Sequence, residues 1–318
     1  MGKPRISCIV CTYNRQDFIL QCLEALTRQT LLPDAYEVVV IDNHSKDETA
    51  SLTKGFIERH PQRNMVCASE ERQGLSHARN KGAAVARSDL LTYIDDDAVA
   101  DPRLLEEILR VFDTYPFAGC VGGRIELALP SDLPWWYSEA LAGYFSHYAL
   151  DGDGITKISK TWQLPYGANF TVLKKPLSEA GGFSTELGRR GKDFSGGEEI
   201  DIAYRIAALG YDLYYNSSAK VTHHIRRDRM TLQHMTQSTK SSARVWVYME
   251  RELMRSNMGV RGDLRNLTKD LTKFFLYLGR DPWRKRFCFF LQALHNYEKV
   301  RTKLAAPIPS LRGQAPYR

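Results

Sequence analysis

The stretch Leu90-Leu91-Thr92-Tyr93-Ile94-Asp95-Asp96-Asp97 decides the fold of this chain. Its first five residues are mostly apolar and rich in β-formers, which predicts a short buried strand. Three carboxylates follow at the carboxyl end of that strand, the edge at which open α/β sheets bind their ligands. Adjacent negative charges repel one another unless they share a cation, and hard oxygen ligands suit Mg²⁺ or Mn²⁺. The plainer interpretation is a solvated loop after the strand.

Strands and helices alternate on both sides of this stretch. The pattern predicts strands at residues 6–11, 37–41, 65–69, 90–95, 119–129 and 212–223. Helical periodicity is found at residues 17–29, 48–59, 76–87, 101–115 and 198–208, with a long aromatic-rich segment at 130–162. Strands that alternate with helices predict an α/β fold with a doubly wound, mostly parallel sheet. A segment as long as 130–162 typically forms a lid or a binding wall.

Charge is distributed unevenly along the 318 residues. Residues 1–218 carry 23 Lys and Arg against 30 Asp and Glu, a net of −7, whereas residues 219–318 carry 21 against 7, a net of +14. The second part is mainly helical in its periodicity. We therefore expect a catalytic or binding domain at 1–228 and a basic helical extension at 229–304. Three prolines in the tail 305–318 favour disorder there.

Cysteine usage and hydropathy bear on location. The six cysteines lie mostly inside apolar runs, which predicts reduced, buried thiols and fits the cytoplasm. The N-terminus has too few apolar residues after its basic stretch for a signal peptide. No apolar run approaches the roughly 18 residues that a membrane-spanning helix needs. A cytoplasmic protein is expected.

Four polar clusters are predicted to lie at one edge of the sheet. Residues 11–15 end the first strand, Asp42 follows the second, and residues 95–97 follow the fourth. Glu198 and Glu199 open a helix after two glycines. A lone acidic residue in a loop is usually surface decoration. Four clusters at the same edge favour a shared ligand site.

With these motifs in order, the sequence resembles the inverting glycosyltransferases of family 2, which have the GT-A fold. The resemblance covers about residues 4–228. Its motifs are residues 7–15 (SCIVCTYNR), 38–47 (VVVIDNHSKD), 74–82 (GLSHARNKG), 93–97 (YIDDD), 167–169 (GAN), 181–183 (GGF) and 197–201 (GEEID). Residues 73–76 and 134–136 extend it towards bacterial enzymes of exopolysaccharide and surface-glycan synthesis.

The resemblance implies a nucleotide sugar as donor. Asp42 matches the carboxylate that accepts a hydrogen bond from a uracil-type base, and Thr12 lies beside that base. Arg79 would face the donor, although a structural ion pair is its plainer role. Asp95 would hold the ribose or water ligands of a metal. Asp97 would bind that metal, Mn²⁺ or Mg²⁺, directly.

The resemblance also implies a second metal ligand, a base and an acceptor side. His223 matches a histidine that adds a metal ligand, although a polar loop residue is its plainer reading. Glu199 stands where the family places its general base, as Glu instead of the usual Asp, which leaves the choice between Glu198 and Glu199 open. The remaining acceptor-binding candidates are Gly167, Asn169, Glu198 and Asp201. Two acids at a helix start also favour the helix dipole without any catalytic role.

The basic extension lies outside the resemblance. Residues 283–291 (WRKRFCFFL) place cations beside aromatics, as interfacial membrane helices do. They predict a possible contact with an anionic membrane, which would put the protein peripherally on the inner face of the cell membrane. A helix packed on the rest of the protein is the alternative.

The leading hypothesis is a metal-dependent inverting transfer of a sugar, UDP-linked by the resemblance, to a glycan or lipid-linked glycan acceptor in bacterial polysaccharide synthesis. A sugar-phosphate nucleotidyltransferase is less favoured, because residues 12–15 contain no glycine for a phosphate loop. A donor-binding pseudoenzyme or glycan-binding module is allowed by the Glu at the base position. A nucleic-acid partner is not expected, since only the basic tail suggests one.

Overall fold

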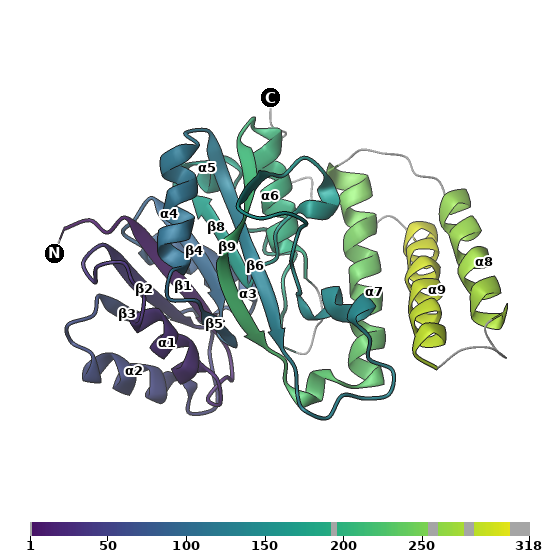
Figure 1. Cartoon of the computed structure of the whole chain (residues 1–318), viewed down its shortest axis with the longest axis horizontal. Coiled ribbons are helices and arrows are strands. Elements are labelled where there is room, and N and C mark those ends of the chain that lie inside the picture. Colours follow the sequence, from purple (N-terminus) through teal and green to yellow (C-terminus); the bar gives the residue numbers. More distant parts are fainter. Residues whose placement is uncertain (1, 192–195, 254–259, 277–282, 306–318) are drawn as a thin grey trace. The chain divides into compact units, whose positions relative to one another are not determined.

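The computed structural model describes residues 2–191, 196–253, 260–276 and 283–305, except for the side chains of 252, 253 and 283 (Figure 1). The chain divides into two compact units. The first comprises Met1–Leu133 and Ala142–Met230, and the second comprises Pro134–Leu141 and Thr231–Arg318. The sequence placed a boundary after residue 228 and did not assign the short piece 134–141 to the C-terminal part. The predicted disordered tail, apart from Ala305, lies outside the described residues.

The first unit is built on one sheet with the strand order β3-β2-β1-β4-β8-β6-β9-β5, and β7 pairs with β9. Strands β1, β2, β3 and β4 pair in parallel, as do β6 and β9. Strand β8 is antiparallel to both of its neighbours, and β5 and β7 are antiparallel to β9. The strands are β1 (Ile6–Thr12), β2 (Tyr36–Asp42), β3 (Met65–Ser69), β4 (Leu90–Asp95), β5 (Ala98–Ala100), β6 (Ala118–Ala128), β7 (Ile155–Lys157), β8 (Asn169–Leu173) and β9 (Asp212–His224). The expected α/β fold with a mostly parallel sheet is confirmed. The short strands β5, β7 and β8 were not predicted.

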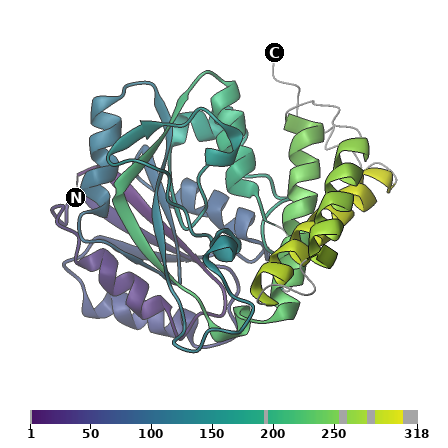
Figure 2. The same ribbon diagram turned by 45° about the vertical axis from the view of Figure 1, so that its right-hand side comes forward.

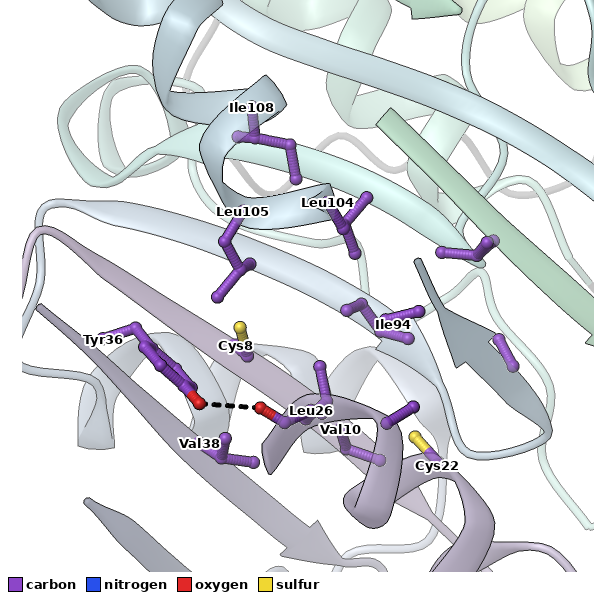
Figure 3. Close-up of a cluster of buried hydrophobic side chains, with 14 of the residues drawn as sticks. Cys8, Val10, Cys22, Leu26, Tyr36, Val38, Ile94, Leu104, Leu105 and Ile108 are labelled. Atoms are coloured by element: carbon purple, nitrogen blue, oxygen red, sulfur yellow. Dashed lines mark hydrogen bonds between the residues drawn. The ribbon is translucent and has the colours of Figure 1, made fainter. Parts of the chain in front are cut away.

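Helices cover both faces of the sheet (Figure 2). On one face, α1 (Ile19–Thr27) and α4 (Leu104–Thr114) pack on the strands, and α2 (Thr49–Arg59) lies beside α1. Alternation along β1 turns Cys8 and Val10 towards this face, where they meet Leu26 and Leu104 in the main hydrophobic core (Figure 3). The hydroxyl of Tyr36 donates to the carbonyl of Leu26 at 2.8 Å, so the core contains no unpaired phenol there.

The other face of the sheet carries α3 (Leu75–Val85), α5 (Lys174–Glu179) and α6 (Glu198–Ala208). Helix α3 approaches β1 closely at Gly82, because a Cβ added there would lie 2.4 Å from the Cγ2 of Ile9. Tyr93 and Phe183 pack edge to face on this side, with ring centroids 5.1 Å apart. This tight packing holds the start of α3 and the start of α6 at the carboxyl edge of the parallel strands.

The aromatic segment 130–162 is partly ordered by the sheet. It contains a 3₁₀ helix, Glu139–Phe145, and strand β7. Tyr148 exchanges backbone hydrogen bonds with Ile125 of β6, so the segment runs back along that strand. This position brings the carbonyl of Phe145 and the backbone of Ser146 to the edge of the sheet where the acidic clusters meet.

The second unit is helical. It contains α7 (Leu232–Tyr248), a π turn at Met249–Leu253, α8 (Val260–Leu276) and α9 (Trp283–Leu304). Helix α9 packs against both α7 and α8. Within this unit, Phe287 lies against Trp135 and Trp136, with ring centroids 6.1 and 5.4 Å away. Among the helices that the structure describes, none is long and apolar enough to cross a membrane.

Candidate functional site

Strand register brings the predicted polar clusters together at one edge of the first unit. Thr12 pairs with Asp42 across β1 and β2, and Cys11 pairs with Asp95 across β1 and β4. A pocket of about 440 Å³ opens at this edge. Its lining includes eight of the predicted site residues: Thr12, Arg79, Asp95, Asp97, Gly167, Glu198, Glu199 and His223.

A three-residue strand explains why Asp97 meets His223. Directly after Asp97 the chain forms β5, which runs antiparallel to the end of β9 and pairs Ala98 with His223. The Oδ1 atom of Asp97 then lies 3.0 Å from the Nε2 atom of His223. Together with Asp95, these residues form a group whose ligand atoms all lie within 4.8 Å of one another.

The group has the chemistry of a divalent metal site. On the far side of the imidazole, Nδ1 of His223 lies 3.0 Å from the carbonyl oxygen of Phe145, which fixes the ring and leaves Nε2 facing the carboxylates. The Oδ2 atom of Asp97 is buried without a hydrogen-bond partner. Burial alone would raise the pKa of Asp97, but the hydrogen bond and charge of His223 hold it below its usual range. Two carboxylates and one imidazole therefore fit Mn²⁺ or Mg²⁺.

Arginines surround these acids. The Nε atom of Arg15 lies 3.1 Å from Oδ1 of Asp96, and both Arg15 and Arg229 have a nitrogen 3.9 Å from Oδ2 of Asp97. Burial lowers the pKa of Arg229 to about 10, so the guanidinium remains charged at neutral pH. Arg189 and Arg226 also line the pocket. Cations in this number suit an anion with several oxygens, such as a diphosphate.

The sequence missed two of these functional candidates. Arg15 was noted only as part of a motif, and Arg229 was not singled out at all. The signal available for Arg229 was the basic run at 226–229 directly after a strand, which the charge count assigned to the extension. Asp96, the middle acid of the triplet, accepts a hydrogen bond from Arg15, and its burial raises its pKa to about 7.

Arg79 lies among three carboxylates in the lining of the pocket. Its Nη1 atom lies 2.7 Å from Oε1 of Glu198 and 4.0 Å from Oε2 of Glu199, and its Nη2 atom lies 3.6 Å from Oδ1 of Asp95. Its guanidinium lies over the ring of Phe183, 5.5 Å from the centroid. Arg79 therefore forms the structural ion pair that was its plainer role, with Glu198, and it does so inside the pocket.

The two adjacent acids at the start of α6 differ in their surroundings. Glu198 is buried against Arg79, and its burial, with the charge of Glu199, raises its pKa to about 8. The Glu199 side chain is 14% exposed and lines the pocket, and its Oε2 atom has no hydrogen-bond partner. The amide of Gly167 donates to its Oε1 atom at 3.4 Å. Glu198 also has a buried Oε2 atom without a hydrogen-bond partner, so the two acids differ in their distance from Arg79, 2.7 Å for Glu198 and 4.0 Å for Glu199, and in the greater exposure of Glu199.

Glycine at position 167 is required by the approach of Arg79. A Cβ on Gly167 would lie 2.2 Å from the Nη2 atom of Arg79, closer than any real contact. The absence of a side chain lets the guanidinium reach Glu198 and lets the Gly167 amide reach Glu199. The expected acceptor-side role of Gly167 stays a prediction.

Three predicted site residues are not part of the pocket lining. Asp42 is partly buried next to Thr12, and its Oδ1 atom has no hydrogen-bond partner. The side-chain Nδ2 atom of Asn169 donates to the backbone carbonyls of Arg124 and Ala219, which fixes this side chain to the sheet. The carboxylate of Asp201 pairs with Arg205 one helical turn later.

The acceptor-binding roles of Asn169 and Asp201 stay predictions that the pocket geometry does not support. The carboxylate of Asp201 is already paired with Arg205, and Asn169, although its Oδ1 atom has no hydrogen-bond partner, is buried away from the pocket lining. A residue that the sequence missed, Asn43, braces the pocket instead. Its side chain donates to the carbonyls of Glu70 and Arg72 and accepts from the amide of Gly74, the residue before α3.

Comparison with known proteins gives a consistent result. Residues 7–178 match the family described as Glycosyl transferase family 2. One relative is a glucosyl-dolichyl phosphate glucuronosyltransferase of Haloferax volcanii, which is 27% identical over 69% of this chain and 69% of its own. Another is a validoxylamine A glucosyltransferase of Streptomyces hygroscopicus subsp. limoneus, which is 26% identical over 65% of this chain and 49% of its own.

Two solved structures share the fold. A mannosyltransferase of Pyrobaculum calidifontis, in complex with GDP-mannose and Mn²⁺, superposes with a TM-score of 0.61 at 17% identity, over 94% of this chain and 88% of its own. Residues 1–349 of TarS from S. aureus, in complex with UDP, superpose with a TM-score of 0.55 at 14% identity, over 93% and 90% of the two chains. The expected GT-A type of fold, with helices after it, is confirmed.

Proposed function

The chain belongs to glycosyl transferase family 2 and is a glycosyltransferase, and we propose that it is a metal-dependent, inverting enzyme. Its donor is a nucleotide diphosphate sugar of the UDP-linked class, and its acceptor is a glycan or a lipid-linked glycan in polysaccharide synthesis. One observation carries the proposal. A single pocket holds a metal-type ligand group, several arginines and an acid with an unpartnered oxygen, Glu199.

The donor class is supported by charge and by position. Arg15 and Arg229 lie beside the metal ligands, where they would bind the oxygens of a diphosphate. Asp42 has a buried, unpartnered Oδ1 atom next to Thr12, which suits the N–H group of a uracil-type base. The two solved neighbours hold GDP-mannose and UDP, so they support a nucleotide donor and leave the base to be tested.

Asp95, Asp97 and His223 would hold the metal. A divalent cation bound there offsets the negative charge of the departing diphosphate. The chain itself supplies a second source of positive charge in the half-buried arginines Arg15 and Arg229. His223 is kept in place by the carbonyl of Phe145, which fixes the direction of its Nε2 atom.

Glu199 acts as the general base. Its Oε2 atom takes the proton of the acceptor hydroxyl while the hydroxyl oxygen attacks the anomeric carbon of the donor sugar. The bond from that carbon to the diphosphate oxygen breaks, and its electron pair leaves with the diphosphate. Attack from the face opposite to the leaving group inverts the configuration. Glu198 does not touch the reacting atoms in this scheme; it positions Arg79.

The acceptor and the location are proposed together. The name of the Haloferax volcanii relative refers to a lipid-linked sugar, which supports a lipid-linked acceptor here. All six cysteines are unpaired, which supports a reducing compartment such as the cytoplasm. We place the protein at the inner surface of the cell membrane as a peripheral protein.

A panel of nucleotide sugars tests the proposal. The purified protein is incubated with each donor and Mn²⁺, and release of the nucleoside diphosphate is measured with and without EDTA. We expect hydrolysis of one or a few UDP-sugars that EDTA abolishes. Full activity in EDTA would overturn the metal assignment, and binding of a donor without any turnover, with acceptors present, would favour a pseudoenzyme.

A further inference from the structure

The charges of helix α8 are segregated between its two sides. Both acidic residues of this helix, Asp263 and Asp270, are buried. Asp263 pairs with Lys299 and Lys303 of α9 at 3.0 and 2.6 Å, and Asp270 accepts a hydrogen bond from Asn296 at 2.8 Å. The negative charge of Asp263 is therefore neutralised within the helical unit, and the carboxylate of Asp270 is hydrogen-bonded there.

Three of the four cations of α8 lie on its exposed side, whereas the fourth, Lys273, is half-buried with its ammonium 5.4 Å from the centroid of the Phe289 ring. Arg261, Arg265 and Lys269 are all exposed, and none of them forms an ion pair with any residue that the structure describes. Their spacing of four residues places them along one side of the helix, since four residues make slightly more than one turn. This row has no acidic residue beside it on α8, so its charge is not compensated.

An apolar stripe borders this row. Leu264, Leu271 and Phe275 are 46%, 41% and 58% exposed. Their spacings of seven and four residues put them within about 40° of one another around the helix, at about 100° per residue. An exposed stripe of this kind beside unpaired cations, on one continuous helix face, is the pattern of helices that lie in a membrane interface.

We propose that this outward face of α8, with Arg261, Arg265 and Lys269 beside Leu264, Leu271 and Phe275, binds an anionic phospholipid surface. The inference rests on the membrane location proposed above and adds the surface that makes the contact. Anionic headgroups complement the row of cations, and the acyl boundary accepts the leucines and the phenylalanine. A second copy of the chain is a poorer partner, because two such faces bring like charges together. A nucleic acid would leave the apolar stripe without a partner.

The surface differs from the one that the sequence favoured. Within residues 284–290 of α9, Phe287 is buried and residues 286, 288 and 289 are half-buried, while Arg284, Lys285 and Phe290 are exposed. The Nε atom of Arg284 donates to the carbonyl of Trp135 at 3.0 Å, and Phe287 is buried against Trp136. The side chain of Trp283 lies outside the described residues. In the sequence, Asp263 and Asp270 are interspersed with the exposed apolar and cationic residues of α8, so the pattern of the exposed face could not be recognised.

Co-sedimentation with vesicles tests the proposal on the full chain. The vesicles are phosphatidylcholine alone or phosphatidylcholine with phosphatidylglycerol. One variant carries Arg261→Glu, Arg265→Glu and Lys269→Glu, and a second carries Leu271→Ser and Phe275→Ser. A matched control reverses three exposed cations of the first unit, Lys54→Glu, Arg59→Glu and Lys81→Glu, which gives the same change in net charge.

The wild type should bind the anionic vesicles and not the neutral ones, and its binding should weaken as salt is added. The triple α8 variant should lose on the order of 100-fold in partition and the apolar variant about tenfold, whereas the control binds as the wild type does. The proposal is overturned if the triple α8 variant binds as tightly as the wild type does. It is also overturned if the wild type binds neutral and anionic vesicles equally, or binds neither. Dimerisation without lipid that the triple variant abolishes would instead assign the face to a second copy. Donor hydrolysis by the same preparations reports on the proposed function separately.

Discussion

The Nη1 atom of Arg79 lies 2.7 Å from the Oε1 atom of Glu198, and both side chains are almost fully buried. This pair makes the two adjacent acids of α6 unequal. Glu198 is held by the guanidinium at 2.7 Å, while Glu199 lies 4.0 Å from it and is more exposed; each acid keeps an Oε2 atom without a hydrogen-bond partner. Burial and the charge of Glu199 raise the pKa of Glu198 to about 8, so the pair of acids retains one proton near neutral pH.

The raised pKa of Glu198 predicts a dependence of stability on pH. Its pKa is about 8 in the folded protein and about 4.3 in the unfolded chain, so the folded state binds the proton more tightly. Its contribution to stability is complete below about pH 4 and is lost as the pH rises towards about 8. Glu198→Gln removes this titration. Relative to the wild type, the variant should gain on the order of 1 kcal/mol in the free energy of unfolding for each pH unit between about 5 and 7.5.

Urea unfolding of both proteins in EDTA, at several pH values, measures this difference. Taking the difference between two proteins cancels the titration of groups that the substitution leaves alone. If the gap between wild type and Glu198→Gln stays constant with pH, Glu198 is ionised in the folded protein throughout, and the assigned proton is wrong.

Metal binding should depend on Asp97. Asp97→Asn removes one carboxylate charge from the group with Asp95 and His223. It should weaken Mn²⁺ binding by about 100-fold or more, because losing a residue that only supports a ligand already costs about 10–100-fold in affinity. Isothermal titration with Mn²⁺ measures the affinity without any substrate. Asp89→Asn changes an exposed acid and serves as the control. Unchanged affinity in Asp97→Asn would place the metal elsewhere.

Gly167 is predicted to be intolerant of a single methyl group. In Gly167→Ala the new Cβ would lie 2.2 Å from the Nη2 atom of Arg79, so the guanidinium must move away from Glu198. Such overpacking typically costs about 1–3 kcal/mol in the free energy of unfolding. The rate of sugar transfer should fall as well, because the Gly167 amide and Arg79 both support the acids of α6. Gly143→Ala is the control, since a Cβ there meets nothing within 4 Å. Equal stability and rate in both variants would contradict the tight contact.

The sequence predicted the parallel half of the sheet well, for a physical reason. Strands β1, β2 and β4 are buried on both faces, so they read as continuous apolar runs, and their polar residues follow at the carboxyl ends. The meeting of Asp95, Asp97 and His223 was reached only through the resemblance. Its physical cause, the three-residue strand β5, is too short to leave a pattern of its own.

Other features depend on contacts between distant segments. The difference between Glu198 and Glu199 comes from Arg79 and Gly167, which lie in other elements and have no periodic signal. Arg229 was grouped with the basic extension because charge counting ignores the fold. The exposed face of α8 was masked by Asp263 and Asp270, whose lysine and asparagine partners on α9 become apparent only in the folded structure.

In the proposed mechanism, Glu199 removes the acceptor proton in a metal-dependent transfer. The most direct test compares the rate of transfer by wild type, Glu199→Gln and Glu198→Gln at saturating donor and Mn²⁺, with donor binding measured on the same preparations. General base catalysis contributes about 10²–10⁴-fold, so Glu199→Gln should lose a factor in that range while it binds the donor normally. Near-normal transfer by Glu199→Gln, with an inactive Glu198→Gln that still binds the donor, would contradict the account and assign the base to Glu198.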